Sequence, residues 1–157
     1  MANGVRIVLP TAADTRALGG RLARVLRAGD LVVLDGPLGA GKTVMVQGIG
    51  AGLGVKGTVV SPTFVIARVH RPLTDATLPL VHVDAYRLGS LAEVDDLDLD
   101  VSVSDAVTVV EWGSGKVERL TDAHLEIRLE RAEQDETRTA ALVPHGGDWA
   151  ARVARLA

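Results

Sequence analysis

The chain has 157 residues, of which 47% are hydrophobic and 24% charged, a balance typical of one globular domain. It has no cysteine, which excludes disulfides and thiolate metal sites, and its net charge of -3 argues against a surface that coats nucleic acid. No apolar stretch approaches the ~20 residues of a membrane span, and the start MANGVRIVLP lacks a secretory signal pattern. We therefore expect a single cytoplasmic domain over residues 1–157.

The first elements along the chain are a strand and a helix. Residues 5–9 suit a strand, and Thr11 or Asp14 can cap the helix that follows. Leucines and valines at helical spacing place one apolar face on this helix, which we expect to end at residues 29–30.

A second strand and helix enclose a glycine-rich loop. Residues 31–35 form a short apolar run typical of a buried parallel strand. The next helix begins near Lys42, and the glycines of GIGAGLGVKG predict that it breaks at about Gly50. A loop that leads into a strand is expected at 59–70, and further strands are expected at 80–84 and 106–112. HLEIRLE and RTAALV are expected to form a hairpin. Asp148 is expected to cap a closing helix whose inward-facing residues are Trp149, Val153 and Leu156.

The glycine-rich loop, GPLGAGKT, matches the phosphate-binding pattern G-x-x-x-x-G-K-[ST] in the required place between a strand and a helix. Glycines let successive backbone N–H groups point inward around phosphate oxygens, and the helix start adds its positive end. Lys42 is expected to reach the β- and γ-phosphates, and the Thr43 hydroxyl to bind Mg²⁺. The residues expected to line the phosphates are Gly36, Leu38, Gly39, Ala40, Gly41, Lys42 and Thr43.

The nucleotide is expected to be ATP. Guanine-specific proteins use an Asn-Lys-x-Asp segment, and the only asparagine here is Asn3.

Together with the loop, the order of elements predicts an α/β fold like that of P-loop NTPases. Its mixed sheet has a parallel core, antiparallel strands towards the C-terminus, and flanking helices.

Two acids close apolar strands and can complete the site. Asp84 ends LVHVD and Glu111 ends AVTVVE, and strand carboxyl ends face the ligand crevice in an open α/β sheet. Either acid can hold Mg²⁺ or orient the attacking water, although each alone could be a solvated acid. Two such acids together favour a functional role.

Two further residues have both a functional and a structural interpretation. Trp112 can stack on adenine or pack in the core. Thr63, within SPTF, has the position of a threonine that senses the γ-phosphate, or it belongs to a simple turn before a strand. His82 lies within an apolar strand and could be an ordinary core histidine.

The segments GPLGAGKT, SPTF, HVDAYRL and VEW, in this order, resemble the bacterial TsaE family over roughly residues 8–113. The resemblance implies an ATPase that acts with the proteins TsaB and TsaD, which install threonylcarbamoyl on adenosine 37 of tRNA. In that process ATP is used to reset the transferase assembly. The residues to which the resemblance assigns roles are Lys42 and Thr43 at the phosphates and Mg²⁺, Thr63 as the switch threonine, Asp84 and Glu111 at Mg²⁺ and water, and Trp112 against the nucleotide.

The resemblance also implies nucleotide contacts from Thr11 to Thr15, which includes Ala12. Where family members usually carry acids, this chain has Pro37 and Ala12, and Val44 replaces a usual second threonine.

Two other functions stay open, a small stand-alone P-loop kinase and a regulatory switch with negligible turnover. Neither a membrane contact nor direct binding of nucleic acid is expected.

Overall fold

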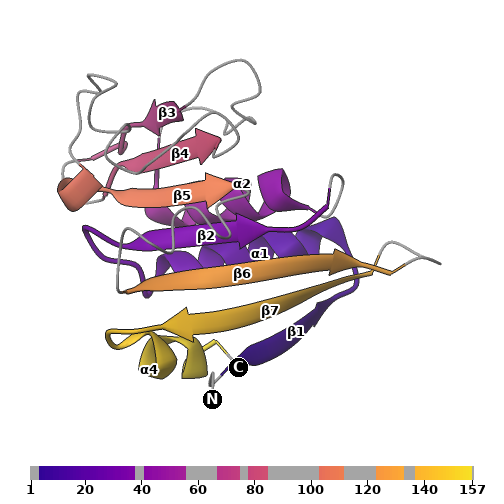
Figure 1. Ribbon diagram of the computed structural model, residues 1–157. Coiled ribbons are helices and arrows are strands. Elements are labelled where there is room, and N and C mark those ends of the chain that lie inside the picture. Colours follow the sequence, from indigo (N-terminus) through magenta and orange to yellow (C-terminus); the bar gives the residue numbers. More distant parts are fainter. Residues whose placement is uncertain are drawn as a thin grey trace.

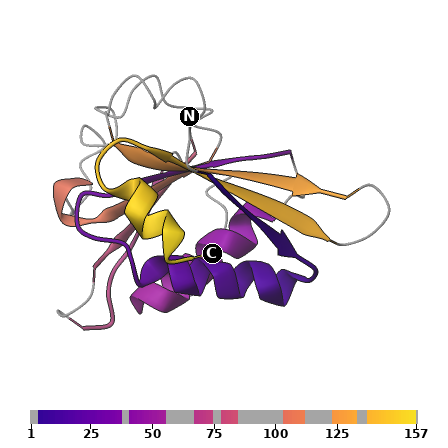
Figure 2. The ribbon, with the colours of Figure 1, turned by 90° about the horizontal axis from the view of Figure 1, so that it is seen from below.

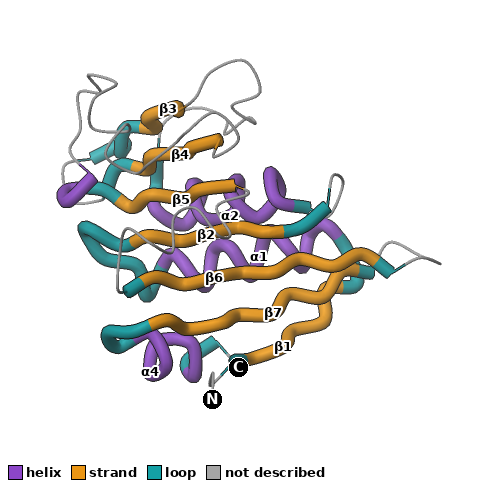
Figure 3. Tube along the Cα trace, in the orientation of Figure 1, coloured by secondary structure: helices purple, strands orange, loops and turns teal. Residues whose placement is uncertain are grey.

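The computed structural model describes residues 4–37, 41–55, 67–74, 78–84, 103–111, 123–132 and 137–156. Within these ranges, seven strands form one sheet in the order β1-β7-β6-β2-β5-β4-β3 (Figures 1 and 3). The strands are β1 Val5–Leu9, β2 Leu31–Asp35, β3 Ala67–His70, β4 Leu80–Asp84, β5 Val107–Glu111, β6 His124–Arg131 and β7 Arg138–His145.

The four central strands, β6, β2, β5 and β4, run parallel to one another. At one edge, β7 pairs antiparallel with β6, and this pair is the expected hairpin. The edge strand β1 pairs antiparallel with β7. At the other edge β3 pairs antiparallel with β4. The predicted α/β fold with a mixed sheet is confirmed, and the antiparallel pairing of β1 and β3 at the two edges is an addition to it.

The described α-helices are α1 Ala12–Ala23, α2 Lys42–Leu53 and α4 Trp149–Ala154, and a 3-10 turn, η2, covers Val103–Asp105. Figure 2 shows α1, α2 and α4 on the same side of the sheet. Their apolar side chains form one buried cluster with alternate residues of the central strands, such as Val32, Leu34 and Val109. None of these helices is long and apolar enough to cross a membrane.

Helix α1 begins with a capping box that uses both of the expected cap residues. The Thr11 hydroxyl accepts a hydrogen bond from the Asp14 N–H at 3.2 Å, and the Asp14 carboxylate accepts one from the Thr11 N–H at 2.9 Å. The helix ends at Ala23, earlier than predicted, because the chain leaves it through i→i−3 hydrogen bonds such as Val25 N–H to Leu22 C=O.

Helix α2 continues to Leu53, so the prediction that its glycines break it near Gly50 is wrong. These glycines serve close packing instead. A Cβ on Gly52 would lie 2.6 Å from the Ala23 Cβ, and one on Gly19 of α1 would lie 2.5 Å from the Met45 carbonyl oxygen. The absent side chains let the two helix backbones approach closely, and the tertiary contact outweighs the low helix propensity of glycine.

Helix α4 follows Asp148 as expected, and Trp149, Val153 and Leu156 are buried. The Asp148 side chain does not cap the helix, however. Its carboxylate binds the Arg152 Nε at 2.9 Å and Arg27 at 3.0 Å. Two guanidinium groups compete successfully with the helix N–H groups for this carboxylate, because charge-assisted hydrogen bonds are stronger than neutral ones.

The β6–β7 hairpin carries a buried carboxylate. Glu126 is 1% exposed and binds the Arg128 Nε at 2.7 Å and the His145 Nε2 at 3.0 Å. Burial by itself raises the pKa of Glu126, but the bonds from Arg128 and His145 outweigh it and hold the pKa below its ordinary value. This cluster ties the two strands together.

Candidate nucleotide-binding site

The phosphate-loop segment joins β2 to α2 at the carboxyl edge of the parallel strands. Strand β2 ends at Asp35, Gly36 follows it, and α2 begins at Lys42 with Gly41 as its N-cap. Gly41 has a φ of 99°, a left-handed conformation that residues with a Cβ rarely adopt. The first N–H groups of a helix have no acceptor within it, so this end of α2 is suited to an anion.

The Lys42 side chain contacts the start of the loop segment. It is 7% exposed, and its Nζ donates a 2.7 Å hydrogen bond to the carbonyl oxygen of Gly36. The bond joins the first glycine of the motif to the helix that ends it. A buried ammonium at the mouth of the helix adds positive charge where the sequence predicts phosphate.

Glu111 lies at the same edge of the sheet, next to the loop. The register pairs it with Leu34 of β2 on one side and with Asp84 of β4 on the other. Parallel strands bring their carboxyl ends together, so the two acids that are far apart in sequence become neighbours along the backbone. The contribution of the Asp84 side chain stays a prediction.

The Glu111 side chain is held by a buried histidine. The His82 Nε2 lies 2.9 Å from the Glu111 Oε2, and His82 is fully buried. Among the described residues, the His82 Nδ1 has no hydrogen-bond partner. A carboxylate can only accept, so the His82 Nε2–H group donates the hydrogen bond to Glu111. The sequence allowed His82 to be an ordinary core histidine, and only the fold reveals this contact.

The oxygen donors near the loop suit Mg²⁺. The hard cation prefers carboxylate and hydroxyl oxygens together with phosphate and water, and it rarely uses an all-protein cage. Thr43, in the first turn of α2, and Glu111 are of this kind. In the ranges that the structure describes, no group of three or more His, Cys, Asp or Glu residues could hold a metal. Thr43 and Glu111 carry oxygen donors of the kind that Mg²⁺ bound together with a nucleotide would use.

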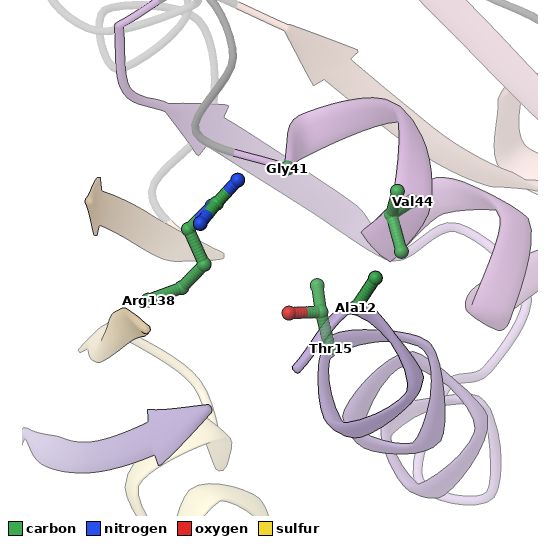
Figure 4. A pocket seen from close by; sticks show the side chains of 5 residues that line it. All are labelled: Ala12, Thr15, Gly41, Val44 and Arg138. Carbon is green, nitrogen blue, oxygen red and sulfur yellow. The ribbon is translucent and has the colours of Figure 1, made fainter. Parts of the chain in front are cut away.

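A small pocket lies beside the N-terminus of α2. It is lined by Ala12 and Thr15 of α1, Gly41 and Val44 at the start of α2, and Arg138 of β7 (Figure 4). Ala12 was expected near the nucleotide. Arg138 was not, because no sequence signal distinguishes it from the other arginines of the hairpin.

Several predicted site residues lie outside the described ranges. These are the loop residues Leu38, Gly39 and Ala40, the switch candidate Thr63, and Trp112. Their roles stay predictions.

The sheet and the G-x-x-x-x-G-K-T segment between β2 and α2 define an α/β protein of the P-loop NTPase-like class. The model of one family, "TsaE: Threonylcarbamoyl adenosine biosynthesis protein TsaE", matches residues 9–140. The chain belongs to the TsaE family, as the sequence motifs predicted.

Individual relatives agree with this assignment. The chain is 61% identical over 139 residues to the tRNA threonylcarbamoyladenosine biosynthesis protein TsaE of Streptomyces coelicolor, covering 86% of this chain and 93% of the relative. It is 51% identical over 146 residues to the protein of the same name from Mycobacterium tuberculosis, covering 89% and 87%. The crystal structure of Bacillus subtilis YdiB superposes with a TM-score of 0.80 at 29% identity, covering 99% of this chain and 95% of that one.

Proposed function

We propose that the protein is the cytoplasmic ATP-binding and ATP-hydrolysing component of the machinery that makes N6-threonylcarbamoyladenosine at position 37 of tRNA. In this proposal it acts with TsaB and TsaD and uses ATP to reset the transferase complex. The observation that carries the ATPase part is the complete phosphate-loop motif at the β2–α2 junction, where Lys42 bonds to Gly36 and Glu111 lies one strand away. Family membership carries the pathway part.

Each part of the site has a defined task in hydrolysis. Lys42 and the N–H groups at the start of α2 bind the phosphates and stabilise negative charge as the β–γ bond breaks. Mg²⁺ would supply positive charge that offsets the negative charge of the phosphates. The Thr43 hydroxyl, Glu111 and Asp84 would hold the ion directly or through water, and one of the acids would orient the attacking water.

His82 keeps Glu111 in position for this task. The Glu111 side chain has three rotatable bonds and could turn away from the loop, and the 2.9 Å contact with the buried His82 restrains it. Thr63 is proposed to sense the γ-phosphate, and Trp112 to stack on the base. The partners then detect which nucleotide is bound, without this protein itself contacting tRNA.

The proposal is tested by measuring ATP hydrolysis with and without TsaB and TsaD from the same organism. We expect the two partners together to raise the turnover rate, and hydrolysis that does not respond to them would contradict the pathway assignment. ADP release that requires one small acceptor would indicate a kinase instead. Binding to the partners that depends on ATP, with negligible turnover, would indicate a regulatory switch.

A further inference from the structure

A second pocket lies where β2 ends beside β6, and we call it the β2–β6 pocket. The residues that line it are Asp35, Gly36, Pro37, Arg128, Leu129 and Glu130. β2 pairs with β6 as far as Asp35 and Arg128, and β6 continues beyond this pair to Arg131 (Figure 1). The pocket therefore joins the first residues of the phosphate-loop segment to the neighbouring strand.

The charged residues of the β2–β6 pocket lie on the face of the sheet away from the helices. Leu34 and Leu129 belong to the buried cluster that includes α1 and α2, and successive residues of a strand point to opposite faces. Asp35, Arg128 and Glu130 therefore point away from the helices that Figure 2 shows on one side of the sheet. The side chains of Arg128 and Glu130 are 58% and 70% exposed, so solvent reaches this face.

The Asp35 carboxylate lacks the partner that the sheet offers to it. The register places Arg128 directly beside Asp35, but the Arg128 Nε donates its hydrogen bond to the buried Glu126 at 2.7 Å. Throughout the described ranges, the Asp35 side chain has no hydrogen bond or ion pair. Asp35 is half-buried, and a carboxylate that is partly removed from water without a partner costs free energy. A cation in the β2–β6 pocket would offset this cost.

The rest of the pocket suits a cation on an aliphatic stem. The ion pair between Glu130 and Arg6 is 3.8 Å long, and both side chains are exposed. Such surface pairs contribute little to stability, so Glu130 can bind another cation at low cost. Pro37 and Leu129 add apolar atoms to the lining, and the stems of arginine and lysine pack well on apolar surface.

We propose that the β2–β6 pocket binds a basic side chain, arginine or lysine, of the partner proteins, with the Asp35 carboxylate as its main contact and Glu130 as the second. This inference rests on the proposed function and names a surface through which the partners act. Gly36 connects that surface to the nucleotide site, because it lines the pocket and its carbonyl oxygen accepts the 2.7 Å hydrogen bond from Lys42. A partner side chain in the pocket thus contacts the segment that positions Lys42.

Asp35→Asn tests the contact, because it removes the charge and keeps the size of the side chain. We expect the affinity for TsaB and TsaD to fall about tenfold or more, as for the loss of a charge-assisted contact. MgATP affinity, measured by calorimetry, and hydrolysis without partners should stay at the wild-type level. The variant should unfold at the wild-type temperature or above it, because an unpaired, half-buried charge is removed. Its affinity for the partners should also depend less on salt than that of the wild type.

Asp105→Asn is the matched control. It removes the same charge from an exposed residue of η2, at the amino end of β5 and thus at the other edge of the sheet from the loop. Its affinity for the partners should equal that of the wild type. Glu130→Gln should give a smaller loss in the same direction as Asp35→Asn, and it replaces that variant if Asp35→Asn does not fold.

Three outcomes would overturn the inference. Unchanged affinity for the partners in Asp35→Asn would remove the pocket from their binding surface. A parallel loss of MgATP affinity would assign Asp35 to the nucleotide site instead, and an equal loss in Asp105→Asn would show that net charge causes the effect. A wild type that binds MgATP but does not respond to TsaB and TsaD would refute the proposed function itself, and this inference with it.

Discussion

The contact between α1 and α2 depends on glycine at one position of α1 and not at the next. A Cβ on Gly19 would lie 2.5 Å from the Met45 carbonyl oxygen and 2.8 Å from the Ile49 nitrogen, both backbone atoms of α2. A Cβ on Gly20 would meet only the Gly48 carbonyl oxygen, at 3.9 Å, which is an ordinary contact. Gly19→Ala therefore forces the two helices apart, whereas Gly20→Ala does not.

The two substitutions have opposite expected effects on the free energy of unfolding. Alanine in place of glycine stabilises a helix interior by roughly 0.5–1 kcal/mol, and Gly20→Ala should show this gain. Gly19→Ala has the same gain, but overpacking a tight contact costs typically about 1–3 kcal/mol. Backbone atoms cannot rotate away as a side chain can, so we expect the upper part of that range and a net loss on the order of 2 kcal/mol.

Urea unfolding followed by circular dichroism measures the free energy of unfolding of both variants and of the wild type. Thermal unfolding followed in the same way gives their melting temperatures. At ~2–4 °C per kcal/mol for a chain of this size, the melting temperatures of the two variants should differ by roughly 6–12 °C. A Gly19→Ala protein as stable as Gly20→Ala would show that the helices can separate at no cost, and would refute the close-packing explanation of the glycines in α2.

Four further predictions concern single side chains. Lys42→Ala should weaken ATP binding by about tenfold to a hundredfold, measured by calorimetry, because it removes a charged phosphate contact; unchanged affinity would count against the loop as the site. Glu111→Gln should lower kcat by about a hundredfold or more while ATP still binds, and His82→Leu should lower kcat with little change in KM. Parallel loss of folding in both variants would instead mark the pair as structural. The pKa of Glu126 lies below its ordinary value of 4.5 in the folded state, so its stabilising contribution is present above that pH and is lost in more acidic solution. Glu126→Gln should therefore lower stability at pH 7 but flatten its decline in acid, as urea unfolding at several pH values would show.

Local patterns in the sequence were enough to locate most elements and to predict where the nucleotide site lies. Residues 31–35 and 80–84 are short apolar runs that form β2 and β4 as expected. The phosphate-loop motif also depends on local features, since glycine conformations and the start of a helix involve neighbours along the chain. For the same reason the cap at Thr11 could be identified in advance.

Other features depended on residues that meet only after folding. Glycine in α2 has a low helix propensity, and only the approach of α1 explains why the helix continues to Leu53. The His82–Glu111 contact joins two strands, and Arg138 reaches the loop because β7 lies beside β1 and β6. Strand order determines these contacts, and it results from packing the whole sheet against its helices. The sequence by itself therefore determined which segment carries the phosphate-loop motif, because that motif is local, and the tertiary structure decided which distant side chains lie near it.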